Sequence, residues 1–338
     1  MMLSIPVIPE TKNYWLVRTN GGRYYNEYKH EGFIGINWNN ISIPDIENLS
    51  YDELSSKIKK EYPEKKKPGR ATSQLRIFNS LIKKGDAVVI TNYASNQFLI
   101  GEVLEDTAFS VIVDEKRMEE NPKLCAYEKR KKVKWLKEVH KWDVDRPMFK
   151  LLQHARNTIN DANAYADIIE SLLHDFFIKG ENAYFSLKVK RESNIPANDF
   201  FKMGSEILDL IDEFGKYKKD SSISSEGIIT KVNVNSEGNA KFIGPMVKVA
   251  TAAYIVVICL TGGGFTVPVP EIMGGGEVDL QTNGLLKEVS DFLDAKQERE
   301  QRDLLLSQYM DHLEIEAPDE LKGLLEAVEN HSSDNTSE

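Results

Sequence analysis

The side chains that could carry out catalysis are scattered along this chain. Its two cysteines, Cys125 and Cys259, lie far apart, and neither is beside a histidine. The six histidines never fall at HxxxH or HxH spacing, so the sequence contains no recognisable thiolate or imidazole metal site. No GxxxxGK[ST] phosphate loop, strand-linked GxGxxG motif or GxSxG nucleophile elbow occurs. We therefore expect no catalytic residue, no metal and no cofactor.

Basic side chains, in contrast, gather in two clusters that could bind phosphate. One surrounds Pro68 and the other begins the run that ends near Trp135. Each lysine or arginine that neutralises a phosphate releases a counterion, which favours DNA or RNA binding at low salt. A solvated surface explains such runs equally well. The candidate phosphate-binding residues are Lys65, Lys66, Lys67, Arg70, Lys129, Arg130, Lys131 and Lys132.

The charge of the chain differs between its two halves. Residues 1–148 carry a net charge of +4 and residues 149–338 a net charge of −14, within a total of −10. A basic domain joined to an acidic one suits a chain of which one part meets a polyanion. The apolar and charged fractions, 41% and 28%, are those of a globular protein. With no signal peptide and no cysteine pair, a reducing cytoplasm is expected.

The elements expected in the first half are short strands and two helices. Aromatic and β-branched residues predict strands at Tyr14–Arg18 and Phe33–Trp38. Ser50 and Glu53 form a capping-box pattern that opens a helix, and a second helix is expected from about Ser73 to Lys83. Short strands follow the Gly85-Asp86 turn, so we expect a small, strongly bent barrel.

The second half has an α+β order of elements. Apolar spacing predicts long helices over about 148–178, 198–218 and 285–309, with strands between them, including 265–269 and 277–281. The expected domains are therefore residues 10–148, residues 149–312, and a partly disordered tail over 313–338. Polar residues at 296–303 predict that the last helix leaves its core and supports self-association.

Four short motifs of the first half stand in an informative order. They are the strands Tyr14-Trp15-Leu16-Val17-Arg18 and Ile34-Gly35-Ile36-Asn37-Trp38, the helix with Gln74 and Phe78, and the turn Lys84-Gly85-Asp86. In these motifs the first half resembles the domain that precedes the nuclease in Mrr-type restriction proteins. That domain is similar to PUA/EVE-like barrels, many of which read modified bases. The resemblance implies a bent β-barrel with inserted helices that binds nucleic acid.

The resemblance also implies an aromatic-walled pocket for a base that has left its stack. The candidate walls are Trp15, Trp38 and Tyr93, and Arg18 and Gln74 are the candidates for hydrogen bonds to the base edge. Because strand tryptophans usually lie in cores, a structural role for Trp15 and Trp38 is the competing interpretation.

A nuclease is the enzyme that the resemblance makes worth seeking. Such a site needs a carboxylate followed at strand distance by ExK or DxK, and Asp114-Glu115-Lys116 is the nearest pattern. It falls in an expected turn of the first domain. A divergent magnesium-dependent nuclease stays as an alternative, since the second half has no such pattern.

The most apolar stretch of the chain, Val249–Pro270, has 22 residues and no charge. Its dense part ends at Leu260, before three glycines, and twelve residues are more typical of a buried helix than of a membrane span. A membrane-acting effector is thus a second alternative and a membrane partner is not favoured. The preferred interpretation is non-catalytic recognition of nucleic acid, DNA rather than RNA, in a prokaryotic defence system. A homo-oligomer and an operon-encoded effector partner are the other partners expected.

Overall fold

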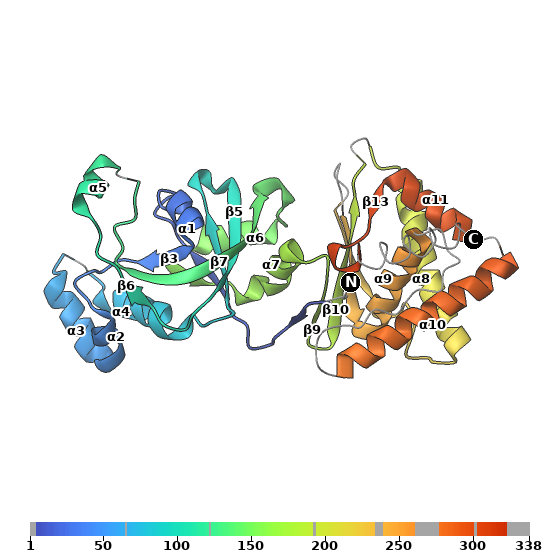
Figure 1. The fold of residues 1–338 in the computed structure, drawn as a ribbon, viewed down its shortest axis with the longest axis horizontal. Coiled ribbons are helices and arrows are strands. Elements are labelled where there is room, and N and C mark those ends of the chain that lie inside the picture. The colour runs from blue at the N-terminus through green and yellow to red at the C-terminus, as the bar shows by residue number, and fades with distance from the viewer. Residues whose placement is uncertain are drawn as a thin grey trace, which may run out of the picture. The chain divides into compact units, whose positions relative to one another are not determined.

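The computed structural model describes residues 5–64, 66–121, 123–191, 194–233, 239–260, 277–300 and 303–322. The chain divides into two compact units (Figure 1). The barrel unit is Thr11–Leu173, and the C-terminal unit combines Met1–Glu10 with His174–Glu338. The predicted α+β class, with a bent barrel first, is confirmed.

The barrel unit is built on a curled sheet with the strand order β3-β7-β5-β4-β2-β8 among the described residues, and β6 pairs with β7. Its strands are β2 (Tyr14–Val17), β3 (Phe33–Ile36), β4 (Ala87–Thr91), β5 (Gln97–Val103), β6 (Phe109–Ser110), β7 (Lys129–His140) and β8 (Ile159–Asp161). Among the described strand pairs of this sheet, β2 and β4 run parallel and all the others run antiparallel. A register shift at Ile100/Gly101 interrupts the β5–β7 ladder, and such bulges increase the bend of a sheet.

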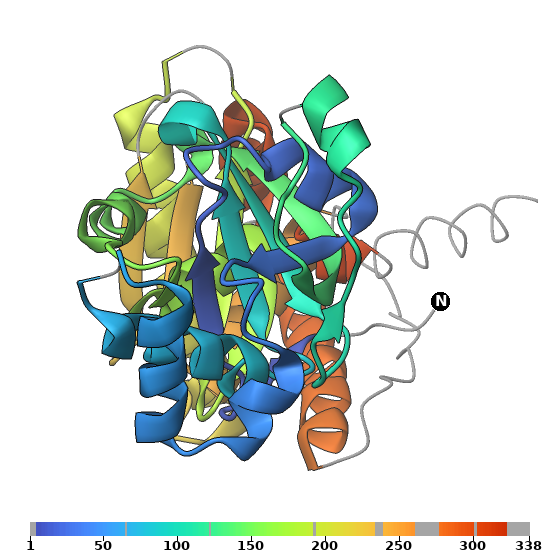
Figure 2. The same cartoon turned by 90° about the vertical axis from the view of Figure 1, so that its left-hand side faces the viewer.

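Helices cover both faces of this sheet (Figure 2). They are α1 (Tyr25–Glu31), α2 (Ile43–Asn48), α3 (Tyr51–Glu61), α4 (Pro68–Arg76), a π-helix η1 (Ile77–Leu81), α5 (Glu115–Glu120), α6 (Pro147–His154) and α7 (Ala166–Leu173), with 3₁₀ turns η2 (Tyr93–Ser95), η3 (Lys141–Asp143) and η4 (Asn163–Tyr165). Because strand side chains alternate, Trp15 and Val17 of β2 face the core under α1–α4, whereas Tyr14 and Leu16 face the core under α6 and α7.

Local sequence signals locate several of these elements correctly. Ser50 caps α3 and its hydroxyl accepts from the Glu53 amide, while the Glu53 carboxylate accepts from the Ser50 amide at 2.8 Å, which is the predicted capping box. In the Gly85-Asp86 turn, Asp86 is buried and accepts from the Trp15 indole nitrogen at 2.9 Å. The turn is therefore tied to the first strand of the barrel.

The long helix expected over residues 148–178 does not exist. Its residues form α6, β8, α7 and β9 (Phe176–Lys179) instead. The apolar residues belong to two short helices, α6 and α7, that pack on one core. Ile159 of β8 lies between them in the sequence and pairs with Val17 of β2. The first unit consequently ends at Leu173 rather than at residue 148.

The C-terminal unit has its own sheet and its own core. The sheet has the order β1-β9-β10-β12-β11 with β13 also pairing β10, and comprises β1 (Val7–Ile8), β9, β10 (Asn182–Val189), β11 (Ile229–Asn233), β12 (Asn239–Pro245) and β13 (Ile315–Glu316). The helices are α8 (Ala197–Lys218), α9 (Met246–Leu260), α10 (Glu277–Glu300) and α11 (Asp303–Leu313), followed by the 3₁₀ turn η5 (Asp319–Leu321). The strand expected at 277–281 is thus the start of a helix.

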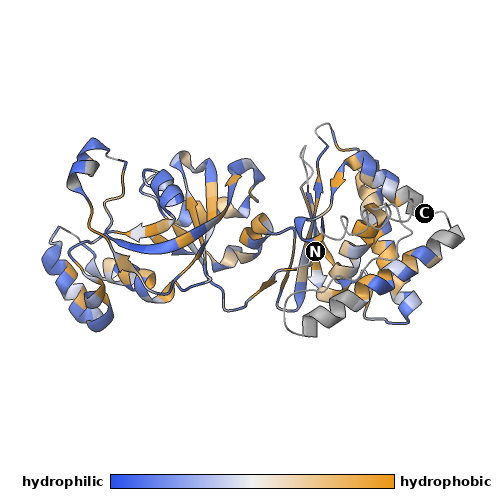
Figure 3. Ribbon diagram, in the orientation of Figure 1, coloured by the Kyte–Doolittle hydropathy of each residue, from blue (hydrophilic) through white to orange (hydrophobic). Residues whose placement is uncertain are grey.

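Helix α9 is the apolar stretch that raised the question of a membrane span. Its residues Val249–Cys259 are all buried in the core of the unit, against α8, α10 and β12, and Figure 3 shows this helix as a hydrophobic segment. Within the described part of the chain, no helix is both long and apolar enough to cross a membrane. Residues 261–270 of the stretch, including the expected strand 265–269, lie outside the described residues.

Candidate functional site

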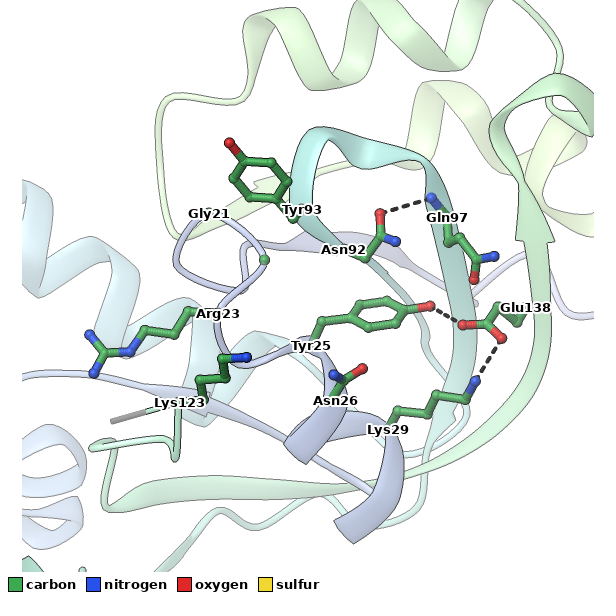
Figure 4. Close-up of a pocket in the computed structure, with 11 residues that line it drawn as sticks. Gly21, Arg23, Tyr25, Asn26, Lys29, Asn92, Tyr93, Gln97, Lys123 and Glu138 are labelled. Atoms are coloured by element: carbon green, nitrogen blue, oxygen red, sulfur yellow. Dashed lines mark hydrogen bonds and ion pairs between the residues drawn. The ribbon is translucent and has the colours of Figure 1, made fainter. Parts of the chain in front are cut away.

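The best candidate site is a hollow in the barrel unit with a volume of about 700 Å³ (Figure 4). Five segments line it: the turn after β2, helix α1, the loop between β4 and β5, the start of β5, and strand β7, with Lys123 from a further loop. The lining residues are Gly21, Gly22, Arg23, Tyr25, Asn26, Lys29, Asn92, Tyr93, Gln97, Lys123 and Glu138. Its size falls in the range of small-ligand pockets.

The wall of this hollow depends on a close approach of two backbones. Asn20, Gly21 and Gly22 all have positive φ, of 53°, 67° and 92°, so the Asn-Gly-Gly sequence suits the conformation. A Cβ placed on Gly22 would lie 2.2 Å from the Tyr93 amide nitrogen, so only glycine fits. Next to this contact, the Thr19 hydroxyl donates to the Thr91 carbonyl oxygen at 2.7 Å. The turn is thereby fixed against the loop between β4 and β5.

Glu138 of β7 carries the negative charge of the hollow. Its Oε1 accepts from the Tyr25 hydroxyl at 2.5 Å, and its Oε2 accepts from Lys29 Nζ at 2.6 Å. The Lys29 hydrogen bond and then the Tyr25 hydrogen bond hold the pKa of Glu138 below its usual value. Burial, followed by the bond to Glu138, raises the pKa of Tyr25. Glu138 is therefore an ionised acceptor at neutral pH, and each carboxylate oxygen can accept a further bond.

The loop between β4 and β5 contributes amides and an exposed ring. The Asn92 Oδ1 accepts from the backbone amide of Gln97 at 2.9 Å, and this hydrogen bond orients the Asn92 side chain. Ala94 and Ser95 have positive φ values of 58° and 53°, an unfavourable conformation for residues with a side chain. The side chain of Tyr93, which lies between Asn92 and Ala94 in the sequence, is 79% exposed. The loop thus presents hydrogen-bonding groups to the hollow, while the Tyr93 ring at its edge points away from Asn92 and Gln97 (Figure 4).

Two of the three basic side chains of the lining lie apart from its one carboxylate, and the third, Lys29, is paired with that carboxylate (Figure 4). Arg23 and Lys123 lie together on the side away from Glu138, whereas Asn92, Gln97 and Glu138 gather at the other side (Figure 4). With Lys29, three basic side chains face one acidic one. A ligand with an anionic part and a neutral part rich in donors and acceptors fits this separation.

Among comparisons with known proteins, the one that matches a family model does so within the barrel unit. A family model described as "Domain of unknown function (DUF8426)" matches residues 14–159. The chain is similar to the YTH domain of Zygosaccharomyces rouxii MRB1, solved with N6-methyladenosine RNA, at 12% identity and a TM-score of 0.28 over 51% of this chain and 92% of that one. It is also similar to the Pho92 YTH domain, solved with m6A, at 16% identity and a TM-score of 0.26 over 50% and 92%. No curated protein matches.

The PUA/EVE-like and Mrr-type relation expected from the sequence has no counterpart among these matches.

Two of the residues predicted for a base pocket have structural roles instead. Trp15 is buried and its indole nitrogen donates to Asp86. The buried Gln74 amide donates to the Ile159 carbonyl oxygen at 3.1 Å, and its Oε1 accepts from the Ile159 amide at 2.7 Å. Gln74 thereby makes to β8 the two hydrogen bonds that a neighbouring strand would make. Both edge a shallow depression, but their polar atoms are already bonded.

Of the other three pocket candidates, Arg18 and Tyr93 line one hollow and Trp38 does not. Arg18 is exposed and shares a second, smaller hollow with Tyr93, which also lines the main one. Trp38, with a φ of 66°, packs partly buried against the core under α1–α4, away from both. Of the predicted set, Tyr93 alone lines the main hollow.

Burial removes two of the predicted phosphate-binding lysines. Lys129 Nζ donates to the Trp38 carbonyl oxygen at 2.7 Å, and Lys131 Nζ donates to that of Ile82 at 2.7 Å and to that of Asp106 at 2.5 Å. Burial lowers the pKa of each lysine to about 8. Their ammonium groups hold backbone carbonyls inside the unit, so they do not face a ligand.

The remaining candidates of this set differ in accessibility. Arg130 lies 3.9 Å over the Phe33 ring and donates to backbone carbonyls, and Arg70 donates to Asn157 at 2.5 Å. Lys132 pairs with Glu105 at 3.1 Å on the surface. Lys66 and Lys67 are exposed, and Lys65 lies outside the described residues. Phosphate contact by these exposed residues stays a prediction.

No alternative chemistry is assembled elsewhere in the described part of the chain. Asp114 begins the segment before α5 and lines a small polar depression with Glu27 and Glu31. Groups of three or more potential metal ligands are absent from the described residues. The nuclease alternative therefore gains no site from this geometry.

Sequence reasoning missed most of the hollow. Gly21, Gly22, Asn92 and Gln97 are ordinary turn or strand residues in the sequence, and Glu138 lies in a run of lysines. The Asn20-Gly21-Gly22 triplet was the one available signal, since consecutive left-handed positions often mark a close backbone approach.

Proposed function

We propose that the barrel unit binds nucleic acid without catalysis and holds one nucleotide in the hollow. The phosphate would lie at Arg23 and Lys123, and the base would lie at Asn92, Gln97 and Glu138. The observation that carries the proposal is that Arg23 and Lys123 lie apart from a side formed by two amides and the Glu138 carboxylate, which is paired with Lys29 (Figure 4).

The chemistry of the lining suits a nucleobase better than an apolar ligand. A base edge presents hydrogen-bond donors and acceptors in one plane, and Asn92, Gln97 and Glu138 supply both kinds of partner. The exposed ring of Tyr93 at the edge of the hollow (Figure 4) offers a further stacking surface for the strand, and stacking on a base is worth about 1–3 kcal/mol. A base must leave its stack to enter such a hollow, and modified or unpaired bases do so at the lowest cost.

Fluorescence anisotropy with labelled oligonucleotides tests the proposal. Single-stranded and duplex DNA and RNA would be titrated with the full chain at low salt, each with and without N6-methyladenine or 5-methylcytosine. We expect saturable binding to at least one of them and discrimination between base types. Absence of binding to every probe at low salt would contradict the proposal.

The cationic side predicts a specific salt dependence. Replacing both Arg23 and Lys123 with alanine removes two phosphate partners, so the slope of log K against log salt should become less steep by about 1–2. The matched control is the double replacement of Lys59 and Lys60, which are also exposed but lie outside the hollow. An equal loss in both double variants would place phosphate binding on the general surface rather than in the hollow.

The lowered pKa of Glu138 predicts the pH dependence of base discrimination. An acid whose pKa is lowered in the folded state keeps its charge above that pKa, so Glu138 accepts hydrogen bonds throughout the neutral and mildly acidic range. As the pH is lowered from neutral, discrimination between bases should stay constant, and it should be lost only below the ordinary glutamate pKa of about 4.3. Glu138→Gln should reduce discrimination at every pH, whereas Glu105→Gln on the surface should not. A midpoint of discrimination near pH 6–7 would instead point to a histidine.

We extend the proposal to the whole chain as a restriction-type defence protein, in which recognition is coupled to assembly or effector action of the C-terminal unit. The support is that the C-terminal unit has a separate core of its own. Self-association and an operon-encoded effector partner stay predictions of this extension, as does a preference for DNA.

A further inference from the structure

We infer that Trp142 is a stacking platform for the nucleotide next to the one in the hollow, so that the bound strand is unpaired at that neighbouring position. The inference rests on the proposed function and deepens it, because it assigns single-stranded nucleic acid as the ligand class. It concerns a residue outside the lining of the hollow.

Trp142 continues the strand that supplies Glu138. It lies in η3, directly after β7, and its side chain is 77% exposed. Glu138 and His140 share one face of β7 because strand side chains alternate, and the rings of His140 and Trp142 are 6.1 Å apart. A path of side chains therefore leads from the hollow to the indole.

The indole is held beside the loop that forms the hollow. The Lys141 amide donates to the Asn96 carbonyl oxygen at 2.9 Å, and Lys141 Nζ donates to Asn96 Oδ1 at 2.7 Å. The same Nζ lies 4.7 Å from the Trp142 ring centroid, and the Trp142 amide donates to His140 Nδ1 at 3.4 Å. Tyr93 thus belongs to the hairpin loop of residues 92–96, and the very exposed Trp142 follows Lys141, which is bonded to that loop.

The chemistry of this arrangement favours an unpaired neighbour. A base stacks on an exposed indole through its π-face, which is covered by the adjacent base pairs in a duplex. Because every base has a π-face, this contact adds affinity with little base preference, whereas Glu138 and the amides discriminate. Lys141 beside the ring can also attract the phosphate that joins the two nucleotides.

The test compares short strands with single nucleotides in the full chain. Binding of a short fluorescein-labelled single strand would be measured directly, and nucleoside monophosphates would be measured by competition. Trp142→Ala should weaken binding of the strand about 5- to 150-fold but change binding of the mononucleotide less than about twofold. Trp142→Phe should recover most of the loss, and Phe201→Ala, at a side chain 67% exposed in the other unit, is the matched control.

Intrinsic fluorescence gives a second readout that a purely structural role would not change. Stacking of a base on Trp142 should quench part of the tryptophan emission when the single strand binds, and Trp142→Phe should remove that quenching. Equal effects of Trp142→Ala on strand and mononucleotide, unchanged strand affinity, or tighter binding of a duplex would overturn the inference alone. If the wild-type chain binds neither ligand, the proposed function fails as well.

Discussion

Replacing Asp86 with alanine is expected to lower the free energy of unfolding of the barrel unit by about 3–5 kcal/mol. The buried carboxylate accepts from the Asn13 amide at 3.0 Å, from the Trp15 indole nitrogen at 2.9 Å and from the Lys83 amide at 2.9 Å. Alanine would leave three donors without this partner, and a buried unsatisfied donor costs about 1–3 kcal/mol. Urea denaturation followed by circular dichroism and tryptophan emission measures the change.

Asp106→Ala is the matched control for this prediction. The Asp106 carboxylate also accepts from a turn amide, that of Lys84 at 2.8 Å, but it lies on the surface. Its replacement should cost less than about 1 kcal/mol because water can take the place of the lost bond. Equal losses in the two variants would show that burial of Asp86 does not matter, and a loss below about 1 kcal/mol for Asp86→Ala would contradict its structural role.

Gly22→Ala is expected to reduce nucleic-acid binding at least about tenfold and to destabilise the barrel unit by about 1–3 kcal/mol. The added Cβ would meet the Tyr93 amide nitrogen at 2.2 Å and the Tyr93 Cα at 2.5 Å. Since these are backbone atoms, the loop that carries Asn92 and Tyr93 must move. The side of the hollow proposed to hold the base would be displaced with it, which anisotropy and denaturation would report separately.

Gly85→Ala separates this collision from the cost of backbone conformation. Gly85 also has a positive φ, 87°, but a Cβ there meets nothing within 4 Å, and it lies outside the lining of the hollow. It should cost only the left-handed strain of about 1–2 kcal/mol and leave binding within about twofold of the wild type. Similar binding losses in the two variants would contradict the role assigned to the Gly22–Tyr93 contact.

Local patterns in the sequence were sufficient for several features of this protein. The capping box at Ser50 depends on two residues three positions apart, and the strand at Tyr14 depends on side-chain type over a few residues. The burial of α9 followed from the length of its apolar run. In each case the physical cause acts within one element, so the sequence around it carries the information.

Side chains alternate along β7, so the lysines at its start lie on two different faces of the sheet. Only the folded sheet shows which of these faces is buried. Lys129 and Lys131 point into the unit because Val133 on the same face is part of the core, whereas Lys132 and Lys134 are exposed. The sequence made Lys129, Lys131 and Lys132 equal candidates for phosphate, because a row of lysines gives no sign of which alternate set will find carbonyl acceptors.

The sequence by itself determined the α+β class, the bent barrel, and the presence of two units of different charge. The tertiary structure decided where the first unit ends, because Glu170 of α7 accepts from the Tyr14 hydroxyl at 2.6 Å across the chain. It also decided the composition of the hollow, whose residues come from segments more than a hundred positions apart, such as Gly22 and Glu138. Contacts at such separations depend on strand order and on the bend of the sheet, which no local pattern encodes.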